Sequence, residues 1–395
     1  MKVLIVHNSY QQPGGEDVAF AGECRLLEEH GHTVIAYRRS NHEIETMSAV
    51  QRLTMPKDLI YSDSSRREIQ ELLLKERPDM VHVHNTFMMI SPSIYPTCQE
   101  MGVPVLQTLH NFRLLCPGWT LSRAGRVCEE CVDHGLWRSV LHGCYRDSRL
   151  MTAGVALMLQ IHRGRGTWSD SVDGYVALSE FARRKFIDNG LPAEKMYVKP
   201  NFVQLDPGER DAPGHYALFV GRLSVEKGAT TLLSAWKKVN RAIPLVIVGD
   251  GPLRQSLEAE AEACGLSSVT FRGWLPGEEA RAAMKEAAFL VIPSLWYEGF
   301  PMIIAEAFAC GTPVICSKLG ALQEIVEDQR TGLHFAHGDA DDLARKVEWA
   351  SEHESQIVAM GKAARQEFEA RYTAEKNYSI LMRIYEQTIR AHARN

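Results

Sequence analysis

Short apolar runs alternate with amphipathic stretches along this chain, and this rhythm restricts the fold more than any other feature of its sequence. In the first half, the apolar runs lie at residues 3–6, 33–37, 80–83, 105–109 and 175–178. Parallel strands that are covered by helices on both faces produce such short, continuous runs. We therefore predict an α/β domain with a doubly wound, Rossmann-like parallel sheet.

A polar segment separates this first series of runs from a second one. Residues 203–216 read VQLDPGERDAPGHY, and two prolines and two glycines in so short a stretch are typical of a linker. Five more runs follow it: ALFVG, LVIVG, VTFRG, FLVIPS and PVICS. The sequence thus predicts two Rossmann-like domains, whose ligand-binding strand ends would face a central cleft.

The same patterns suggest where the domains begin and end. A chain of 395 residues is longer than one hydrophobic core usually supports. We predict an N-terminal domain at 1–205, with a cysteine-rich insertion at about 111–148, and a C-terminal domain at 206–372. The tail has helical spacing that breaks near Thr373, and a last helix at 373–395 is expected to pack back on the N-terminal domain.

Charge and hydropathy exclude several classes of protein. The formal net charge of −5 leaves no excess of basic residues, so no nucleic-acid partner is expected. The apolar start MKVLIVHNSY is too short for a secretory signal, and no run approaches the ~20 apolar residues of a membrane span. We therefore expect a cytoplasmic protein whose nine cysteines are kept reduced.

The second domain begins with a glycine-bracketed loop that carries two cations. Gly221, Arg222 and Lys227 lie in GRLSVEKG, directly after the strand ALFV. Because a guanidinium forks onto phosphate oxygens and an ammonium adds a mobile positive charge, this loop could cradle a diphosphate. The alternative is a solvated basic loop, since Arg and Lys mostly lie at the surface.

Two glutamates flank an apolar stretch further along the second domain. In PSLWYEGFPMIIAEAFACGTPVI, Glu298 and Glu306 are separated by seven residues. The part PMIIAEAFACG predicts a helix with Pro301 in its first turn and a stop at Gly311. The free N–H groups at its start, such as those of Met302 and Ile303, could meet sugar hydroxyls or phosphate.

Glu306 lies among apolar residues of this predicted helix. A carboxylate there needs a polar partner, and a ribose diol offers two hydroxyl donors. The alternative is a glutamate on the solvent side of an amphipathic helix. We favour the first interpretation, because the neighbouring residues leave little polar surface to share.

These motifs together resemble a known family, the retaining glycosyltransferases of the GT-B fold in glycosyltransferase family four. FVGRLSVEKG, LVIVGDGP, VTFRGW and the two-glutamate run stand in the order and approximate spacing of that family. The resemblance covers nearly the whole chain and is densest in the second domain. It implies two facing Rossmann-like domains, an acceptor-side N-terminal one and a donor-binding C-terminal one.

The resemblance also implies roles for single residues of the second domain. Arg222 and Lys227 would bind the donor diphosphate, Glu306 the ribose, and Glu298 the donor sugar. The other implied donor contacts are glycines, an aromatic residue and the start of the apolar helix: Gly221, Gly249, Trp274, Gly299, Phe300, Pro301, Met302 and Ile303.

Fewer residues of the first domain match the motifs of the family. Gly14 and Gly15 resemble the family's glycine-rich loop before a helix starting near Glu16, where the backbone approaches the distal phosphate. A G-x-G-x-x-G pattern is absent there, which disfavours a nicotinamide enzyme. His110 ends the predicted strand VLQTLH and matches a family histidine beside the donor sugar, whereas a lone histidine would more often be structural. His84 ends VHVH in a similar place.

From this resemblance we expect transfer of a hexosyl unit, with retention, to a hydroxyl of a glycan, lipid-linked or small-molecule acceptor. UDP is the commonest nucleotide in such families and is expected on that ground alone. Polysaccharide or glycolipid biosynthesis would be the setting, with His110, Glu298, Arg222 and Lys227 at the reacting centre and no cofactor for catalysis. The alternatives are an epimerase or phosphorylase on the same fold, or an inactive sugar-nucleotide-binding protein.

Two further features lie in the first domain. Cys116, Cys128, Cys131 and Cys144 include a C-x2-C pair, which is the spacing of a structural zinc site, and some relatives have similar insertions. Free thiols, or two disulfides in an oxidising compartment, are the alternatives.

A second feature is the apolar stretch 151–161, which is flanked by arginines on both sides. Burial in the first domain is the favoured interpretation. The alternative is peripheral contact with an anionic membrane, which would suit a lipid-linked acceptor.

Overall fold

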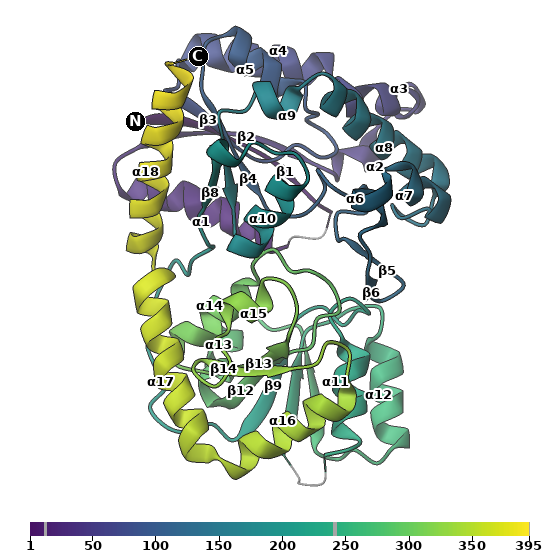
Figure 1. The fold of residues 1–395 in the computed structure, drawn as a ribbon, viewed down its shortest axis with the longest axis vertical. Helices are drawn as coiled ribbons and strands as arrows, with labels where there is room; N and C mark the ends of the chain where they lie inside the picture. Colours follow the sequence, from purple (N-terminus) through teal and green to yellow (C-terminus); the bar gives the residue numbers. More distant parts are fainter. Residues whose placement is uncertain (12–13, 240–242, 395) are drawn as a thin grey trace. The chain divides into compact units, whose positions relative to one another are not determined.

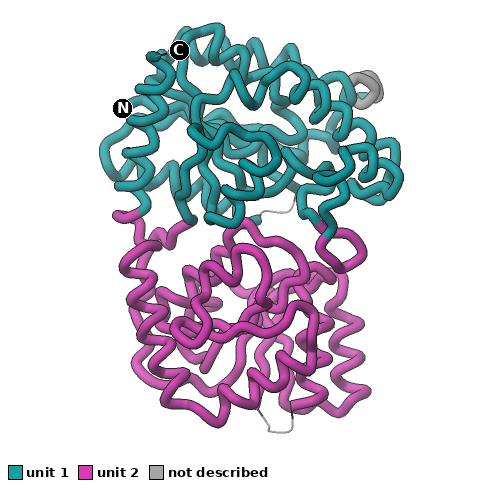
Figure 2. Tube along the Cα trace, in the orientation of Figure 1, with its two compact units in different colours: residues 1–121, 128–200, 377–395 teal, residues 122–127, 201–376 magenta. Residues whose placement is uncertain are grey.

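A computed structural model describes residues 1–11, 14–239 and 243–394, with the backbone alone at 49–54. The chain divides into two compact units (Figure 2). Unit 1 comprises residues 1–121, 128–200 and 377–395, and unit 2 comprises residues 122–127 and 201–376. Apart from residues 122–127, the chain therefore passes from unit 1 to unit 2 after Pro200 and returns at Asn377.

Unit 1 is built on a six-stranded sheet in which every strand pair is parallel, in the order β2-β1-β3-β4-β7-β8 (Figure 1). Its strands are β1 (Lys2–Ser9), β2 (Thr33–Ser40), β3 (Met80–Asn85), β4 (Val105–Leu109), β7 (Gly174–Ala177) and β8 (Met196–Val198). Five of them coincide with the predicted apolar runs. The sequence analysis missed β8, because three residues are too few to show a pattern.

Helices separate these strands in the chain. They are α1 (Gly15–Glu29), α2 (Glu43–Thr46), α3 (Ala49–Ile60), α4 (Asp63–Glu76), α5 (Ile94–Glu100), α6 (Glu130–His134), α7 (Trp137–His142), α8 (Arg149–Gly164), α9 (Thr167–Asp170) and α10 (Glu180–Asp188). The short antiparallel pair β5 (Ser122–Arg123) and β6 (Arg126–Val127) interrupts the cysteine-rich insertion and groups with unit 2.

Unit 2 repeats the architecture with the order β11-β10-β9-β12-β13-β14. Its strands are β9 (Tyr216–Val220), β10 (Leu245–Val248), β11 (Val269–Gly273), β12 (Ala287–Ile292), β13 (Val314–Ser317) and β14 (Gly332–Phe335). Its helices are α11 (Ala229–Trp236), α12 (Arg254–Ala263), α13 (Gly277–Glu286), α14 (Met302–Ala309), α15 (Leu322–Ile325), α16 (Ala340–Glu352) and α17 (Glu354–Arg371). The sequence analysis missed β14, whose run Gly-Leu-His-Phe alternates too little to be distinguished from a loop. Two doubly wound parallel sheets confirm the predicted α/β fold class.

The C-terminal helix α18 (Ala374–His392) belongs to unit 1 from Asn377 onward. Its buried residues Leu381 and Ile384 pack in one apolar cluster with Val3 and Ile5 of β1. The chain therefore completes the core of its first unit with its last helix. Only Tyr372 and Thr373 separate α18 from α17, close to the break predicted from the sequence.

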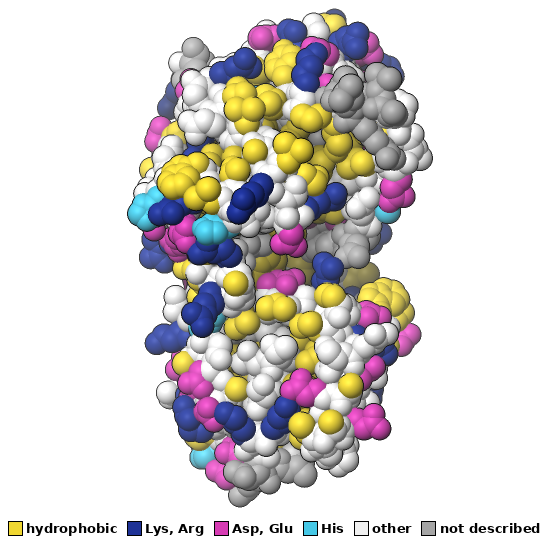
Figure 3. All heavy atoms as spheres, turned by 90° about the vertical axis from the view of Figure 1, so that its right-hand side faces the viewer, with side chains coloured by type: hydrophobic (Ala, Val, Ile, Leu, Met, Phe, Trp, Pro, Cys, Tyr) yellow, Lys and Arg dark blue, Asp and Glu magenta, His cyan; other side chains and the backbone are white. Residues whose placement is uncertain are grey.

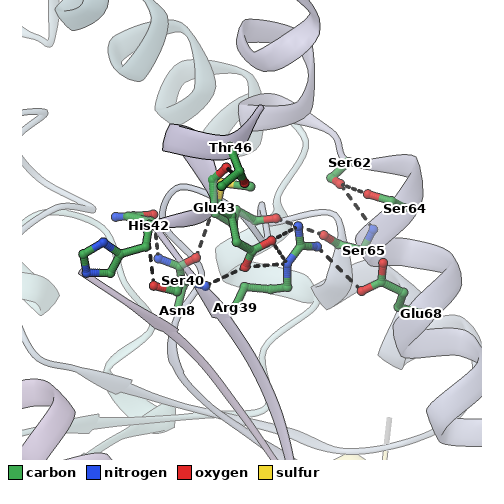
Figure 4. Close-up of polar contacts among 12 residues, drawn as sticks. Asn8, Arg39, Ser40, His42, Glu43, Thr46, Ser62, Ser64, Ser65 and Glu68 are labelled. Carbon is green, nitrogen blue, oxygen red and sulfur yellow. Dashed lines mark hydrogen bonds and ion pairs between the residues drawn. The ribbon is translucent and has the colours of Figure 1, made fainter. Parts of the chain in front are cut away.

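A polar cluster joins the carboxyl end of β2 to α2 and α4 (Figure 4). Arg39 Nε donates to both carboxylate oxygens of Glu43, at 3.0 and 2.9 Å, and another Arg39 nitrogen lies 3.7 Å from Glu68. Ser62 caps α4 by accepting from Ser65 N at 3.2 Å. Because these groups already satisfy one another, the cluster serves the fold.

Candidate functional site

The two loops at the switch point of the sheet in unit 2 carry the predicted cations and one predicted carboxylate. Strand β9 lies between β10 and β12, so the chain leaves the sheet in opposite directions from β9 and β12. The loop after β9 contains Arg222 and Lys227, and the loop after β12 contains Glu298. Open α/β sheets bind ligands where the connections diverge in this way.

Lys227 and Glu298 form an ion pair between these two loops. Lys227 Nζ donates to Glu298 Oε1 at 2.7 Å, and Ser294 Oγ donates to the same oxygen at 2.8 Å. The Lys227 ammonium also lies 5.3 Å from the ring centre of Trp296. Glu298 is 7% exposed, and although burial alone would raise its pKa, the charge of Lys227 lowers it. The carboxylate is therefore ionised at neutral pH.

Arg222 is exposed, and no described residue accepts a hydrogen bond from its guanidinium. The backbone of its neighbour Gly221 packs against that of Gly249. A Cβ at position 249 would lie only 1.9 Å from the Gly221 carbonyl oxygen. Gly249 also has a φ of 135°, which only glycine adopts without strain. The loops after β9 and β10 thus approach each other backbone to backbone beside an unpaired cation.

Helix α14 starts at Met302, with Pro301 as its N-cap, one residue later than predicted. Ile304 N bonds back to Pro301 O, whereas the N–H groups of Met302 and Ile303 precede the hydrogen bonds of the helix. The helix ends at Ala309, and Gly311 follows with a φ of 70°. The predicted helix and its stop are therefore present.

Glu306 lies on α14 and is partly buried. Burial raises the pKa of its carboxyl group, and the charge of Arg281 lowers it by a smaller amount. Within the described part of the chain, no hydrogen bond to this carboxylate is present. It is therefore a partly desolvated group that a ligand hydroxyl could satisfy.

The remaining predicted residues of unit 2 differ in exposure. The side chain of Phe300 is buried, with its ring 5.4 Å from that of Tyr372, and its carbonyl accepts from Asn201 at 3.4 Å. A ligand could therefore meet this segment through the backbone and not through the Phe300 ring. Trp274 follows β11 and is 73% exposed, and no contact joins it to Lys227 or Glu298.

In unit 1, His84 and His110 lie at the carboxyl ends of adjacent strands. His84 is in β3 and His110 directly follows β4, and His84 Nδ1 lies 2.9 Å from His110 Nε2. Gly15 opens α1, with Gly14 as the N-cap, and both are exposed. Asp17 of the first turn accepts from the Gly14 N–H at 2.8 Å and lies 2.9 Å from His7 Nε2, which ties the start of α1 to β1.

The sequence analysis missed a carboxyl group beside these histidines. Asn85 Nδ2 donates to Glu16 Oε1 at 2.9 Å, and Asn111 Nδ2 donates to Glu16 Oε2 at 3.2 Å. Burial raises the pKa of Glu16 to about 8. The sequence does contain a signal for this group of side chains. The dipeptide His-Asn occurs at 84–85, where β3 ends, and again at 110–111, directly after β4.

Three of the four predicted zinc ligands lie near one another. Cys116 and Cys131 share a hydrogen bond, which lowers the pKa of the Cys116 thiol and raises that of Cys131. The backbone of Gly118 lies close to Cys144, and a Cβ at position 118 would be 3.3 Å from the Cys144 backbone oxygen. No three of the four sulfurs lie within 4.8 Å of one another in the described structure. The zinc site of Cys116, Cys128, Cys131 and Cys144 stays a prediction.

The predicted apolar stretch forms most of α8, and its burial is one-sided. Val155, Met158 and Leu159 are buried, whereas Leu150 is 84% and Leu157 is 53% exposed. No helix in the described ranges is long and apolar enough to cross a bilayer.

Comparison with known proteins agrees with this arrangement in both units. Residues 13–207 match the family described as Glycosyltransferase Family 4, and residues 206–367 match the family described as Glycosyl transferases group 1. The chain belongs to this glycosyltransferase family. The predicted family membership is thereby confirmed.

Three curated relatives illustrate the spread of the family. An uncharacterised glycosyltransferase of Methanocaldococcus jannaschii is 31% identical over 51% of this chain and 53% of its own length. Sulfoquinovosyl transferase SQD2 of Arabidopsis thaliana is 27% identical over 77% of this chain and 56% of its own length. Glycogen synthase of Mycobacterium tuberculosis is 28% identical, over 73% and 64% respectively. This glycosyltransferase chain thus spans about half to two thirds of the length of these relatives.

Solved structures show the same fold. Sucrose-phosphate synthase from Thermosynechococcus elongatus aligns with a TM-score of 0.72 at 19% identity, over 99% of both chains. Anabaena Alr3699/HepE, determined in complex with UDP-glucose, aligns with a TM-score of 0.66 at 18% identity, over 98% of both chains. At such identities these likenesses establish the fold of the glycosyltransferase chain, and its substrates are a separate question.

Proposed function

We propose that this chain is a retaining glycosyltransferase that moves a hexosyl unit from a nucleotide-diphosphate sugar to an acceptor hydroxyl. The observation that carries the proposal is the Lys227–Glu298 ion pair at the switch point of unit 2, together with the unpaired guanidinium of Arg222 on the same loop as Lys227. The pair can hold an ammonium near a diphosphate and a carboxylate near sugar hydroxyls. Family membership supports the same assignment.

The proposed mechanism is electrostatic. The acceptor oxygen attacks the anomeric carbon on the face from which the diphosphate departs, and a phosphate oxygen of the leaving group takes the acceptor proton. Arg222 and Lys227 stabilise the negative charge that grows on the diphosphate, so the two side-chain cations take the part that a metal ion plays elsewhere. Glu306 would bind the ribose diol, and His110 and Gly15 would contact the sugar and the distal phosphate.

We propose UDP as the nucleotide, because relatives of the same fold have been determined with UDP or UDP-glucose. UDP at 1 mM is expected to raise the melting temperature by several degrees, since a ligand that binds only the folded state stabilises it by mass action. GDP, dTDP and ADP at the same concentration serve as matched controls. If one of these three raises the melting temperature more than UDP does, that nucleotide and not UDP is the donor nucleotide.

The sugar and the reaction class are tested on the same protein. With each UDP-hexose in turn, transfer to acceptor or slow hydrolysis to UDP and free hexose is expected. Formation of an epimeric nucleotide sugar, or of a sugar phosphate from orthophosphate, would instead identify the enzyme as an epimerase or a phosphorylase. Tight donor binding without any turnover would identify a binding protein.

We further propose that the acceptor is lipid-linked and that unit 1 meets it on an anionic membrane. Helices α7 and α8 pack together and expose Trp137, Leu141, Leu150 and Leu157. Residues 137–165 contain five arginines and one aspartate, within a chain whose net charge is −5. Figure 3 shows hydrophobic side chains gathered on this side of unit 1, with Lys and Arg side chains between them. Exposed apolar residues among cations are typical of a surface that rests on anionic lipid.

Sedimentation with vesicles tests this surface. The protein is expected to bind vesicles with 30% phosphatidylglycerol, and the double substitution Leu150→Glu and Leu157→Glu should weaken binding about tenfold or more, because two apolar side chains no longer enter the interface. Leu74→Glu is the matched control, since Leu74 is 60% exposed on α4 and lies outside this segment. Absence of binding by the unchanged protein would refute membrane contact and leave a soluble glycan or small molecule as acceptor.

A further inference from the structure

A buried network of ionisable side chains lies in unit 1 behind His110. Glu23 of α1, His82 and His84 of β3, and Lys199 after β8 are each at most 4% exposed. Lys199 Nζ donates to Glu23 Oε2 at 2.8 Å. Glu23 Oε1 lies 2.8 Å from His82 Nδ1 and 3.3 Å from His84 Nε2. The burial of four ionisable groups in one place requires an explanation, because a buried charge is costly unless it is paired.

The carboxylate and the histidines could in principle hold a metal ion, since one ligand atom from each of Glu23, His82 and His84 lies within 4.8 Å of the others. The neighbouring side chains disfavour a metal ion at this position. The ammonium of Lys199 occupies the second carboxylate oxygen and would repel a cation. Both nitrogens of His82 also have partners, with Tyr385 Oη at 2.9 Å and Thr108 Oγ1 at 2.8 Å. The cluster is therefore a hydrogen-bond network.

Lys199 determines the charge of this network. Burial would raise the pKa of Glu23, but Lys199 and then His82 lower it well below its usual range. Asn377 of α18 holds the same ammonium through its Oδ1, at 3.1 Å. Glu23 is thus an anion whose oxygens only accept hydrogen bonds.

An anionic Glu23 fixes the proton on His84. Burial and the neighbouring His82 lower the pKa of His84 to about 4, so the ring is neutral and carries one proton. The atom that faces Glu23 is Nε2, which lies 3.3 Å from Glu23 Oε1 and forms no hydrogen bond with any described residue. The anionic oxygen at 3.3 Å attracts a proton on Nε2 and would repel its lone pair, so Nε2 carries the proton and Nδ1 is left as an acceptor.

The protonation state of His84 fixes that of His110 through the next hydrogen bond. His84 Nδ1 lies 2.9 Å from His110 Nε2, and since His84 Nδ1 has no proton, His110 Nε2 must donate. Burial and His84 lower the pKa of His110 well below its usual value, so this ring is also neutral. Its Nδ1 then has a free lone pair, and no described residue donates to it.

We infer that Glu23 is a positioning residue which, through His84, holds His110 as the neutral tautomer with a proton on Nε2 and a bare Nδ1. His84 and His110 line a cavity at the carboxyl ends of β3 and β4. A bare Nδ1 accepts a hydrogen bond from a neutral hydroxyl and repels a carboxylate or phosphate oxygen. The ligand that His110 selects is therefore a sugar hydroxyl, and this last step rests on the proposed function.

Nitrogen NMR of the whole chain, labelled with 15N at histidine, reads these tautomers directly. His110 is assigned from the signal that disappears in His110→Asn. The expected result for the unchanged protein is a protonated Nε2 and an unprotonated Nδ1 in both His84 and His110. A proton on His110 Nδ1, or a charged His110 ring at pH 7.5, would overturn the inference.

Two substitutions of His84 separate a positioning role from a packing role. Asn at 84 can offer its Nδ2–H to the anionic Glu23, which leaves its Oδ1 as the acceptor toward His110, so His84→Asn should preserve the tautomer of His110 and the KM for the donor. His84→Leu removes that acceptor, and we expect a mixture of His110 tautomers and a KM raised about tenfold, with kcat changed less. Equal KM values and tautomers for the two variants would contradict the relay.

Glu23 is tested together with its cation, so that no buried charge is left alone. The double substitution Glu23→Gln and Lys199→Met should release the tautomer of His110, because an amide can donate as well as accept. His162 is an internal control, since it bonds to Ile60 O and Thr167 elsewhere in unit 1 and should be unchanged. A His110 tautomer that the double variant leaves intact would exclude Glu23 from the relay. The spectra need no turnover, so they stand even if the proposed activity fails.

Discussion

Replacement of Lys227 with alanine is expected to lower the transfer rate about 1000-fold. Its ammonium is 2.7 Å from Glu298 and is assigned to the leaving diphosphate in the reaction. Removal of one preorganised charge from a transition state costs roughly 10²–10³ in kcat. The measurement is the initial rate of UDP release from the donor at saturating acceptor.

The folded state should survive this change, because Ser294 still donates to Glu298 and the Lys227 side chain is partly exposed. A fall of only a few degrees in melting temperature is expected. Lys227→Arg, which keeps the charge, should retain more activity than Lys227→Ala. The control is Lys238→Ala, whose ion pair with Asp341 is exposed and should leave the rate unchanged. A Lys227→Ala rate within tenfold of the unchanged protein would disprove the diphosphate assignment.

Lys199→Met is expected to have the largest effect on stability, a loss of about 3–5 kcal/mol in the free energy of unfolding at pH 7.5. It leaves the Glu23 carboxylate buried without its cation, and an uncompensated buried charge costs that much. Urea unfolding, followed by circular dichroism, measures the loss. Addition of Glu23→Gln to the same variant should recover most of it, because the stranded charge is then removed.

The pH dependence of this loss has a definite sign. The pKa of Glu23 is lowered in the folded state, so the carboxylate contributes stability above its unfolded value of about 4.5, and the contribution is lost as the pH falls through the folded pKa. Lys199→Met abolishes that contribution. The difference between the variant and the unchanged protein should therefore be largest near neutral pH and shrink at pH 4. A surface control, Lys238→Met, should change stability by about 0.5 kcal/mol or less at either pH.

The local pattern of the sequence determined both sheets and much of the proposed donor site. Continuous apolar runs identified ten of the twelve strands, because a strand buried on both faces has to be apolar along its length. The cations Arg222 and Lys227, Glu298, and the helix α14 with Glu306 were predicted for a similar reason. A loop, a cap and a helix stop each depend on a few neighbouring residues.

Only the tertiary structure decided which of these side chains meet. Lys227 and Glu298 are 71 positions apart, Lys199 and Glu23 are 176, and His82 and Tyr385 are 303. Pairs of that kind depend on strand order and on the return of α18 to unit 1, and no local periodicity records either. In the sequence, Glu23 looks like any other glutamate of an amphipathic helix. Its role depends on a lysine and two histidines that the fold brings next to it. The physical reason is that a buried charge or a histidine tautomer is determined by its neighbours in space, whereas a strand or a helix cap is determined by its neighbours in the chain.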